Sequence, residues 1–245
     1  MSVVVVTGTG TGVGKTVVTA ALATLAQRNG QSVAVVKPGQ TGLATDEPGD
    51  LDEIRRLTGI RELHEHARFP APLAPATAAR VAGVAPLNLF QSAELIATLT
   101  NAHDLVLVEG AGGLLVRYDD SPTTIADLAG WLAARVVVVV HASLGTLNHT
   151  DLTMRAMSEH KLDCHGIVIG SWPKQPDLAE RCNLRDLELL ARAPLAGAIA
   201  EDAGQLAPDK FLEVANLGLS PSLGGNFNAG AFRARFDPAT PEASP

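Results

Sequence analysis

Gly14, Lys15 and Thr16 stand together at the end of a glycine-rich stretch near the start of the chain, and side chains of these types can hold phosphate groups. Glycine recurs at alternate positions from Gly8 onward, and it permits the positive-φ turns that aim backbone N–H groups into one concave nest for phosphate oxygens. The Lys15 ammonium can then reach the β- and γ-phosphates, and the Thr16 hydroxyl can ligate Mg²⁺. The stretch predicts a phosphate-binding loop (P-loop) for a nucleoside triphosphate.

The segments on both sides of this loop support the same interpretation. Residues 3–6 are all valine, which suits a strand buried on both faces of a parallel sheet, and residues 15–29 fit a helix that ends at Gly30. A glycine-rich turn that only joins a strand to a helix is the alternative, and the Lys-Thr pair argues against it. Five residues separate Gly8 from Gly14, one more than usual, so the loop is a longer variant.

Lys37 and Glu109 each close an apolar strand, at residues 32–37 and 105–109. Open α/β sheets bind their ligands at the carboxyl ends of the strands, so both side chains are expected near the P-loop. An acidic residue at such an end is the Walker B pattern, whose carboxylate holds Mg²⁺ directly or through water. The glycines at 110–113 let the backbone approach the phosphates closely. Lys37 taken alone could equally extend its ammonium group to solvent.

Two predicted helix starts carry possible binding groups. Asp50 begins a short helix at 50–57, after a long acidic and glycine-rich loop at 39–49. Capping of that helix is the simplest interpretation of Asp50, and a free carboxylate oxygen could still bind a metal ion. The unpaired N–H groups near Gly145 and Thr146 form a site suited to a carboxylate.

Strands alternate with helices along the chain and predict an α/β fold: a doubly wound, mostly parallel sheet of the P-loop NTPase type, in one domain at residues 1–236. The other predicted strands are residues 136–140, 166–170 and, as a short strand or loop, 194–199. The other predicted helices include one that ends near residue 83 and those at 87–101, 121–134, 146–160 and 177–192. The pattern weakens beyond Gly204, and residues 237–245, with three prolines, are expected to be disordered.

The composition narrows the classes of function. The chain has 245 residues, of which 46% are hydrophobic and 18% charged, and its net charge is −7. No basic cluster favours binding to nucleic acid or to an anionic membrane, and no apolar run is long enough to span a bilayer. Cys164 and Cys182 lack metal-ligand spacing and are interpreted as free thiols of a cytoplasmic protein. His141 and His149 are interpreted as structural, since no nucleophile motif accompanies them.

The chain resembles dethiobiotin synthetases in four segments that follow in the family's order: residues 7–16, 37–38 with 41–42, 108–113 and 144–149. The segment at 194–197 also fits. This resemblance implies a homodimeric ligase that uses ATP and Mg²⁺ to close the ureido ring of dethiobiotin from 7,8-diaminononanoate and CO₂ or bicarbonate. It also implies the order of steps: one amine takes up CO₂ as a carbamate, ATP phosphorylates the carbamate, and the second amine displaces phosphate.

The resemblance further implies roles for individual residues. The catalytic groups would be Lys37, Lys15 and Thr11. Mg²⁺ would be held by Thr16, Asp50 and Glu109, with Asp46 and Asp52 as alternatives to Asp50. The nucleotide would contact Gly12, Val13, Gly14, Lys15, Thr16, Val17, Gly170, Ser171, Trp172, Pro194 and Gly197. The diamine would contact Thr41, Gly110, Ala111 and Gly112 and, at a helix start of the other subunit, Gly145, Thr146, Leu147 and Asn148.

The chain departs from the family pattern at two places. Gly170 and Ser171 stand where many members have Asn-Asp, so the amide that would read adenine is missing. Gly12 stands where many members carry Glu. Both departures concern base selectivity and nucleotide affinity rather than the phosphate chemistry.

Two other functions are open to a P-loop protein of this size. A nucleotide switch of the partition or metal-delivery type commonly has an additional lysine early in the loop, whereas this chain has Gly8, Thr9 and Gly10 there, and it has no Cys/His cluster for a metal. A cobyrinate-type amidating synthetase would need a glutaminase domain, for which the chain has neither the length nor a nucleophilic cysteine motif.

Overall fold

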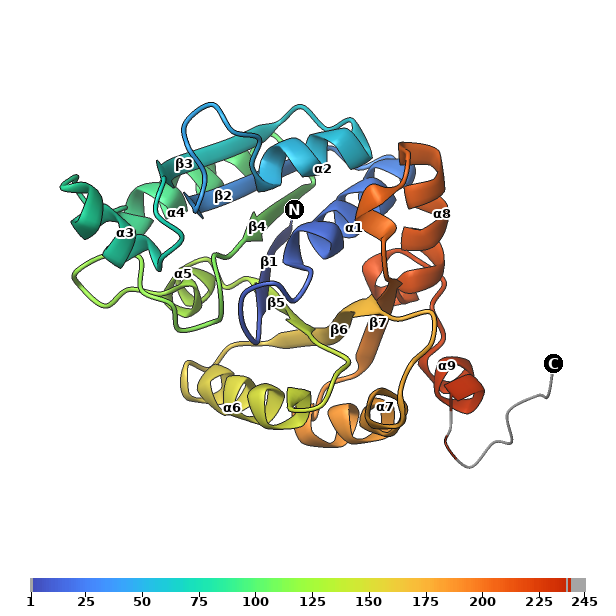
Figure 1. The fold of residues 1–245 in the computed structure, drawn as a ribbon. Helices are drawn as coiled ribbons and strands as arrows, with labels where there is room; N and C mark the ends of the chain where they lie inside the picture. Colours follow the sequence, from blue (N-terminus) through green and yellow to red (C-terminus); the bar gives the residue numbers. More distant parts are fainter. Residues whose placement is uncertain (1, 237, 239–245) are drawn as a thin grey trace.

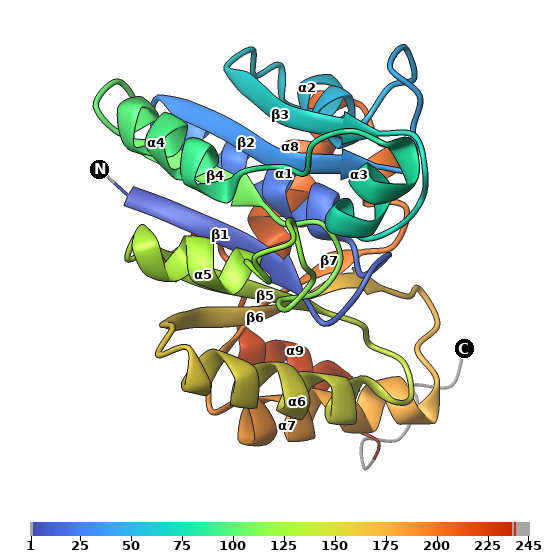
Figure 2. The same ribbon diagram turned by 90° about the vertical axis from the view of Figure 1, so that its left-hand side faces the viewer.

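Seven parallel strands form one sheet in the order β3-β2-β4-β1-β5-β6-β7 (Figure 1). The computed structural model describes residues 2–236 and 238. The strands are β1 (Ser2–Gly8), β2 (Val33–Thr41), β3 (Leu63–Phe69), β4 (Leu105–Glu109), β5 (Arg135–Val140), β6 (Cys164–Trp172) and β7 (Leu195–Ala200). Their arrowheads end at the same edge of the sheet (Figure 2), so the side chains that follow the strands can meet there.

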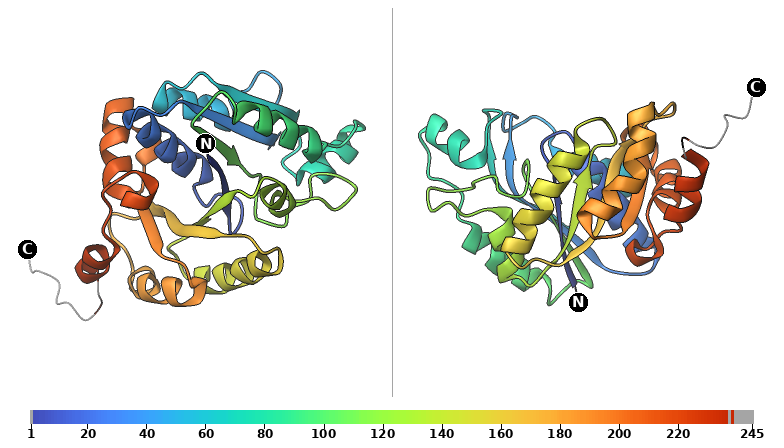
Figure 3. Two further views of the ribbon diagram at one scale, coloured as in Figure 1. Left: turned by 180° about the vertical axis from the view of Figure 1, so that it is seen from behind. Right: turned by 90° about the horizontal axis from the view of Figure 1, so that it is seen from below.

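Helices cover both faces of this sheet. One face carries α1 (Lys15–Arg28), α2 (Asp50–Thr58) and α8 (Pro208–Gly218). The other carries α4 (Leu89–Leu99), α5 (Ile125–Trp131), α6 (Thr146–Glu159), α7 (Leu178–Ala191) and α9 (Ala229–Phe236). α3 (Pro75–Ala82) packs on β2 and β3, and two short 3₁₀ helices, η1 (Ala203–Gln205) and η2 (Pro221–Leu223), flank α8. Seen from behind, α1 and α8 lie side by side (Figure 3).

The valines of β1 place this strand in the centre of the molecule. Val5 belongs to the core under α4 to α7, while Val4 and Val6 belong to the core under α1, α2 and α8. A strand with apolar side chains on both faces is stable only when both faces are covered. The predicted fold, a doubly wound parallel sheet of the P-loop type, is therefore confirmed.

The structure differs from the predicted elements around β2. Residues 39–41 continue this strand instead of forming a loop, because they pair with a strand that the sequence pattern did not reveal. That strand, β3, reads Leu-His-Glu-His-Ala-Arg-Phe and lies at the edge of the sheet, where polar side chains remain partly exposed. The pairing sets Gln40 beside Arg68 and Thr41 beside Phe69. The helix predicted at 121–134 is shorter, because a capping box of Thr124 and Asp127 starts it at Ile125.

Residues 205–236 are structured, although their sequence pattern is weak. Phe211 of α8 is completely buried against the α1 face. In α9, Phe232 and Phe236 pack edge-on against Trp172, with ring centroids 5.1 Å and 5.0 Å away. The disorder expected for residues 237–245 concerns residues that, apart from Pro238, lie outside the described part. Within residues 2–236 and 238, every helix is too short or too polar to cross a bilayer.

Candidate active site

The P-loop joins β1 to α1 and rests on the backbone of β6. Gly14 is the N-cap of α1 and has a φ of 95°, a left-handed conformation that favours glycine. A side chain on Gly14 would come within 2.8 Å of the Gly170 carbonyl oxygen, and a side chain on Gly170 would overlap the carbonyl oxygen of Val13. The loop thus requires glycine on both sides of this contact, which places Gly170 directly behind the phosphate site.

Lys15 folds back over the loop. Its ammonium nitrogen donates to the Gly10 carbonyl oxygen at 2.9 Å, and the residue is buried. The pKa of Lys15 is lowered to about 8, first because burial disfavours the charged form and then because the Lys37 ammonium is close. An anion beside Lys15 would stabilise the charged ammonium against both effects, so this position favours phosphate.

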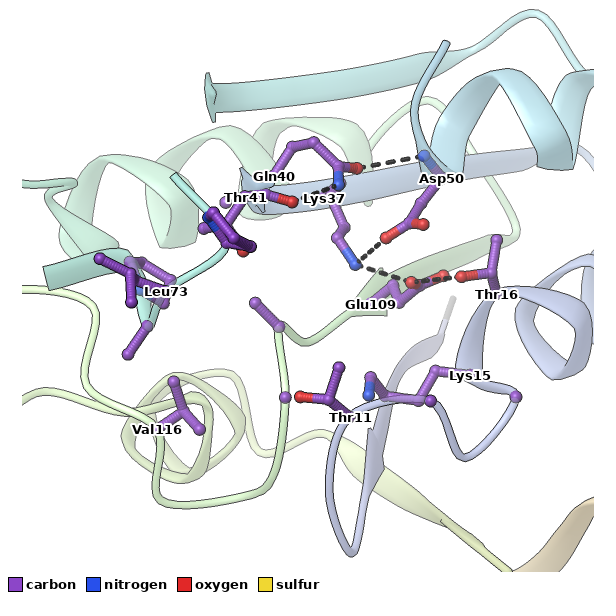
Figure 4. A pocket seen from close by; sticks show the side chains of 18 of the residues that line it. Thr11, Lys15, Thr16, Lys37, Gln40, Thr41, Asp50, Leu73, Glu109 and Val116 are labelled. Carbon is purple, nitrogen blue, oxygen red and sulfur yellow. Dashed lines mark hydrogen bonds and ion pairs between the residues drawn. The ribbon is translucent and has the colours of Figure 1, made fainter. Parts of the chain in front are cut away.

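Lys37 lies between two carboxylates (Figure 4). Its Nζ is 2.5 Å from Asp50 Oδ2 and 2.7 Å from Glu109 Oε1. The Thr16 hydroxyl donates to the same Glu109 oxygen at 3.0 Å. The starts of α1 and α2, the end of β4 and the middle of β2 therefore bring Thr16, Asp50, Glu109 and Lys37 together. The predicted meeting of these side chains is confirmed, but Lys37 does not close its strand, because β2 continues to Thr41.

Burial and charge act in opposite directions within this cluster. Burial alone would lower the pKa of Lys37, but the carboxylates of Glu109 and Asp50 outweigh it and raise that pKa above its usual range. Burial likewise disfavours the charged form of Asp50, yet the Lys37 ammonium lowers the pKa of this carboxyl group. Glu109 is the more deeply buried acid, and burial raises its pKa despite the same ammonium. Lys37 is thus held as a cation by a pair of acids.

The donor set of this cluster fits Mg²⁺. Carboxylate and hydroxyl oxygens are the ligands that this ion prefers, and Glu109 Oε2 is buried with no hydrogen-bond partner among the described residues. In the described part of the chain, no group of three or more His, Cys, Asp or Glu side chains is placed so that it could hold a metal ion. A magnesium ion here would therefore complete its shell with water and phosphate oxygens, as is common in phosphoryl-transfer sites.

Of the three aspartates considered for this site, only Asp50 contacts the cluster. Asp52 accepts the Gly49 N–H at 2.9 Å and pairs with Arg55 at 3.0 Å on the outer side of α2. Asp46 lies exposed in the preceding loop. The geometry therefore favours Asp50 as the acid of α2 that could reach a metal ion.

The P-loop and this acid–lysine cluster both line a cavity of about 800 Å³. Thr11 and Lys15 lie on one side of it and Thr41 on the opposite side (Figure 4), and Gly12 and Val17 also belong to the lining. The end away from α1 is apolar, and Figure 4 shows Leu73 and Val116 there. The apolar lining includes Pro72, Leu73, Ala74, Pro75 and Val116. The cavity thus combines a cationic, hydrogen-bonding half with an aliphatic half.

The glycine segment after β4 is held from both sides. Lys37 donates to the Gly110 carbonyl oxygen at 3.3 Å, and the N–H of Ala111 donates to the Tyr118 hydroxyl at 2.6 Å. Tyr118 is completely buried, and burial raises its pKa. The peptide between Gly110 and Ala111 therefore has a fixed orientation beside the cavity, where Ala111 and Gly112 form part of the lining.

Other predicted site residues lie away from the cavity of this chain. Gly145, with a φ of 96°, caps α6, and Thr146 to Asn148 form its first turn. These residues do not line the cavity, and the N–H of Thr146 donates to the Ser143 carbonyl oxygen at 3.2 Å. Leu144, just before them, is 85% exposed. Within one chain, this helix start is a separate surface.

Of the two segments predicted to hold the base, only the one at the end of β6 lies near the P-loop. Gly170 and Ser171 lie near the carboxyl end of β6, but the Trp172 side chain is only 6% exposed because α9 covers it. Pro194 lies before the amino end of β7, where its carbonyl oxygen accepts the N–H of Ile167. Gly197 lies inside β7 and packs against the end of α8. The structure therefore does not bring Pro194 and Gly197 to the edge that carries the P-loop.

Sequence reasoning missed several residues that shape the site. Gln40 accepts the N–H of Asp50 at 3.1 Å, and Tyr118 orients the glycine segment. The apolar wall, residues 72–75 with Val116, was assigned no role from the sequence. Gln40 carries no recognisable motif, although its position three residues after Lys37 at a strand end could have marked it.

The parallel sheet, the P-loop and the acid at the end of β4 define a P-loop nucleotide-binding protein. The sequence pattern of the AAA domain family matches residues 2–204. The fold is similar to the cell division ATPase MinD of Pyrococcus furiosus, with a TM-score of 0.56, 17% identity and coverage of 91% of this chain and 97% of that one. A ParA family ATPase from Chlorobium tepidum gives a TM-score of 0.54 at 15% identity, with coverage of 91% and 96%. At these identities the likeness concerns the fold alone.

Curated relatives at much higher identity specify the family. The ATP-dependent dethiobiotin synthetase BioD of Frankia casuarinae is 58% identical over 97% of this chain and 100% of its own length. Its counterpart in Mycobacterium tuberculosis is 51% identical over 84% of this chain and 92% of its own length. The chain belongs to the family of ATP-dependent dethiobiotin synthetases. The predicted resemblance is confirmed, and so is the prediction that the chain is an enzyme, a ligase.

Proposed function

We propose that this chain makes dethiobiotin by joining CO₂ to both amines of 7,8-diaminononanoate, with ATP as the energy source. The observation that carries this proposal is the position of Lys37, 2.5 Å from Asp50 and 2.7 Å from Glu109, across a cavity from the P-loop. A P-loop alone serves many ATPases. A second buried lysine at the same edge of the sheet suits an enzyme that must bring a second anion to the γ-phosphate.

The residues around the cavity support such a meeting of two anions. Lys15, the P-loop N–H groups and the positive end of α1 would hold the triphosphate. Lys37 and Thr41, on the facing wall, would hold a carbamate. Fixed cations and dipoles of this kind stabilise developing charge without reorganisation, which is often the largest contribution to catalysis.

Thr16, Asp50 and Glu109 are the residues that would hold Mg²⁺. The ion would offset charge on the β- and γ-phosphates of the bound nucleotide. Asp50 and Glu109 contribute a second effect, because their charges keep Lys37 protonated in a buried place. A protonated Lys37 can orient a carbamate oxygen toward phosphorus.

The reaction proposed for this site has three steps. An amine of the substrate attacks CO₂ and loses a proton, which gives a carbamate that Lys37 and Thr41 orient. A carbamate oxygen then attacks the γ-phosphorus, ADP leaves, and Lys15 stabilises the charge that develops on the transferred group. Finally the second amine attacks the carbonyl carbon of the mixed anhydride, phosphate leaves, and the ureido ring closes.

The rest of the substrate has its own supports in this proposal. The apolar wall of the cavity, including Leu73 and Val116, suits an aliphatic chain. The carboxylate at the end of that chain would bind the start of α6 of a second copy, since Gly145 and its neighbours do not line the cavity of their own chain. We therefore propose a homodimer. We also propose a cytoplasmic location, which the free thiols of Cys164 and Cys182 support.

The test is an assay with purified protein, Mg-ATP, bicarbonate and 7,8-diaminononanoate, with dethiobiotin and ADP measured by mass spectrometry. We expect both products in equal amounts, and neither when the diamine or bicarbonate is left out. Absence of dethiobiotin, under conditions in which an authentic dethiobiotin synthetase forms it, would refute the proposal. ATP turnover indifferent to the diamine but stimulated by a protein would instead favour a nucleotide switch.

A further inference from the structure

Arg68, on the edge strand β3, binds the loop that leads to Asp50. Its Nη1 donates to the carbonyl oxygens of Ala44 at 3.0 Å and Glu47 at 2.5 Å. Its Nε and Nη2 donate to the two carboxylate oxygens of Glu65 at 2.7 Å and 2.8 Å. This two-point pairing fixes the plane of the guanidinium group, so the hydrogen bonds to the loop have a set direction.

Gln40 holds the next part of the same connection. It is the in-register neighbour of Arg68 across β2 and β3, and only 5% of it is exposed. Its Oε1 accepts the N–H of Asp50 at 3.1 Å, and its Nε2 donates to the Thr41 carbonyl oxygen at 3.3 Å. The first turn of a helix leaves its N–H groups without partners, and the N-cap of α2, Gly49, has no side chain to supply one. Gln40 thus caps α2 from a neighbouring strand.

Gly49 fits between these two side chains because it is glycine. A Cβ at this position would lie 2.8 Å from Arg68 Nη2 and 3.1 Å from Gln40 Oε1. The backbone of Gly49 is therefore in close contact with both groups. The next residue, Asp50, then directs its carboxylate to Lys37 at 2.5 Å.

We propose that Arg68 is a positioning residue for the metal site: together with Gln40, it fixes where α2 begins and thereby where the Asp50 carboxylate stands. This proposal rests on the proposed function, because it takes Asp50 as a magnesium ligand. Arg68 itself does not line the cavity. Its effect passes through residues 42–49, which have no helix or strand of their own to hold them.

The experiment measures the affinity of the ADP-bound protein for Mn²⁺, used as a spectroscopic substitute for Mg²⁺, by electron paramagnetic resonance. Arg68→Met removes the hydrogen bonds to the loop. Gly49→Ala adds a methyl group that crowds Arg68 Nη2 and Gln40 Oε1 without changing any charge. We expect each variant to raise the dissociation constant for Mn²⁺ by about tenfold, the order found when groups that orient metal ligands are removed. Arg68→Lys should recover part of that loss.

Two variants serve as matched controls. Arg155→Met breaks an exposed arginine–carboxylate pair within α6, and Gly130→Ala adds a methyl group where only Leu162 lies nearby, at 3.9 Å. Neither should change Mn²⁺ affinity by more than about twofold. A lower melting temperature for Arg68→Met and Gly49→Ala, with Mn²⁺ affinity unchanged, would overturn the proposal and leave Arg68 as a stabilising residue only.

Asp50→Asn separates this proposal from the proposed function. If Asp50→Asn weakens Mn²⁺ binding while Arg68→Met and Gly49→Ala do not, the positioning role is wrong and the metal assignment stands. If Asp50→Asn has no effect on Mn²⁺ affinity, the assignment of Asp50 as a ligand fails, and the positioning role fails with it. If Arg68→Met does not fold, Gly49→Ala and Gln40→Leu decide the question by the same measurement.

Discussion

Lys15 and Lys37 are both buried lysines at one site, yet their surroundings give them different chemistry. Lys15 contacts a neutral carbonyl oxygen, and its pKa falls to about 8. Lys37 contacts two carboxylates, and its pKa rises. An incoming polyanion would therefore stabilise the charged form of Lys15 most, whereas two carboxylates already stabilise the charged form of Lys37. This difference suits Lys15 to the triphosphate and Lys37 to the orientation of a smaller anion.

The first prediction concerns Lys15. Lys15→Ala removes a fixed positive charge beside the transferred phosphoryl group, so we expect kcat to fall by at least about a hundredfold, ~2.7 kcal/mol of transition-state stabilisation. Lys174→Ala, which removes an exposed lysine paired with Asp202, is the control and should leave kcat unchanged. Dethiobiotin formation by Lys15→Ala within about tenfold of the unchanged protein would contradict the role.

The second prediction concerns the cysteines. Burial raises the pKa of the Cys164 thiol to about 11, and Cys182 is exposed on α7. Only the thiolate reacts with an alkylating agent, so at pH 8 roughly one in a thousand Cys164 thiols would be reactive. We expect iodoacetamide to label Cys182 first, and labelling of Cys164 to accelerate as the pH approaches 11.

Peptide mass spectrometry measures the labelling of each cysteine. Equal labelling rates in denaturant would provide the reference, because unfolding removes the burial of Cys164. If Cys164 of the folded protein reacted as fast as Cys182 at pH 8, the shift assigned to its pKa would be wrong.

At the scale of elements, three helix starts present most of the groups assigned to the site. α1 presents the P-loop, α2 presents Asp50, and α6 presents the first turn proposed to bind the substrate carboxylate. Gly14 and Gly145 cap α1 and α6 in the same left-handed conformation, with φ values of 95° and 96°. The two helices thus begin alike, although the first is expected to bind phosphate and the second a carboxylate.

The third prediction uses this helix start. Gly145→Ala places a side chain in the left-handed region, which costs about 1–2 kcal/mol and disturbs the first turn of α6. We expect the KM for the diamine to rise while ATP affinity stays unchanged. Gly30→Ala is a matched control, because Gly30 also has a positive φ, 78°, and free space around it, but it follows the far end of α1. An equal effect of both substitutions on KM would show that stability alone had changed.

Particular elements explain how far the sequence could predict this structure. The strands that carry Lys37 and Glu109 were predictable because runs of valine and leucine permit little except buried strands, and parallel strands share one carboxyl edge. The end of β2 was not, since it continues past Lys37 to Thr41 by pairing with β3. β3 was not predictable, because its histidine, glutamate and arginine residues resemble a surface loop. Only its pairing with β2 makes it a strand. Gln40 was missed because its contact with Asp50 depends on where α2 begins, which the sequence alone does not fix.

At the scale of the whole molecule, the proposed homodimer would be needed to complete the substrate site. The cavity is lined by the residues proposed to hold phosphate, metal and carbamate, while the start of α6 belongs to a separate surface of the same chain. If the partner copy supplies that helix start, each site takes residues from two chains. The fourth prediction follows from this division.

Two inactive variants should restore activity when they share a dimer. Lys15→Ala disables the phosphate side, and Gly145→Asp sets a carboxylate against the substrate carboxylate, since Asp tolerates the left-handed region. In a random mixture, half of the dimers are mixed and one site in each is intact, so roughly a quarter of the sites should be active. A dethiobiotin assay of the co-expressed mixture measures this fraction, and mixed dimers isolated with two affinity tags should have about half of their sites active.

The control pairs two variants that act on the same side of the site. Lys15→Ala mixed with Glu109→Gln leaves every site of the mixed dimer with one defect, because both residues come from the same chain. No activity should return. Equal recovery in both mixtures, or in neither, would refute a substrate site shared between two copies.

The contact between the P-loop and β6 limits the order in which substitutions can be tolerated at positions 14 and 170. Gly170 has no room for a side chain while the carbonyl group of Val13 points toward it, and Gly14 has none while the carbonyl group of Gly170 lies opposite. A side chain at position 170 can therefore be tolerated only after the loop has taken another path. Substitutions in the P-loop and at the end of β6 are therefore expected to be coupled.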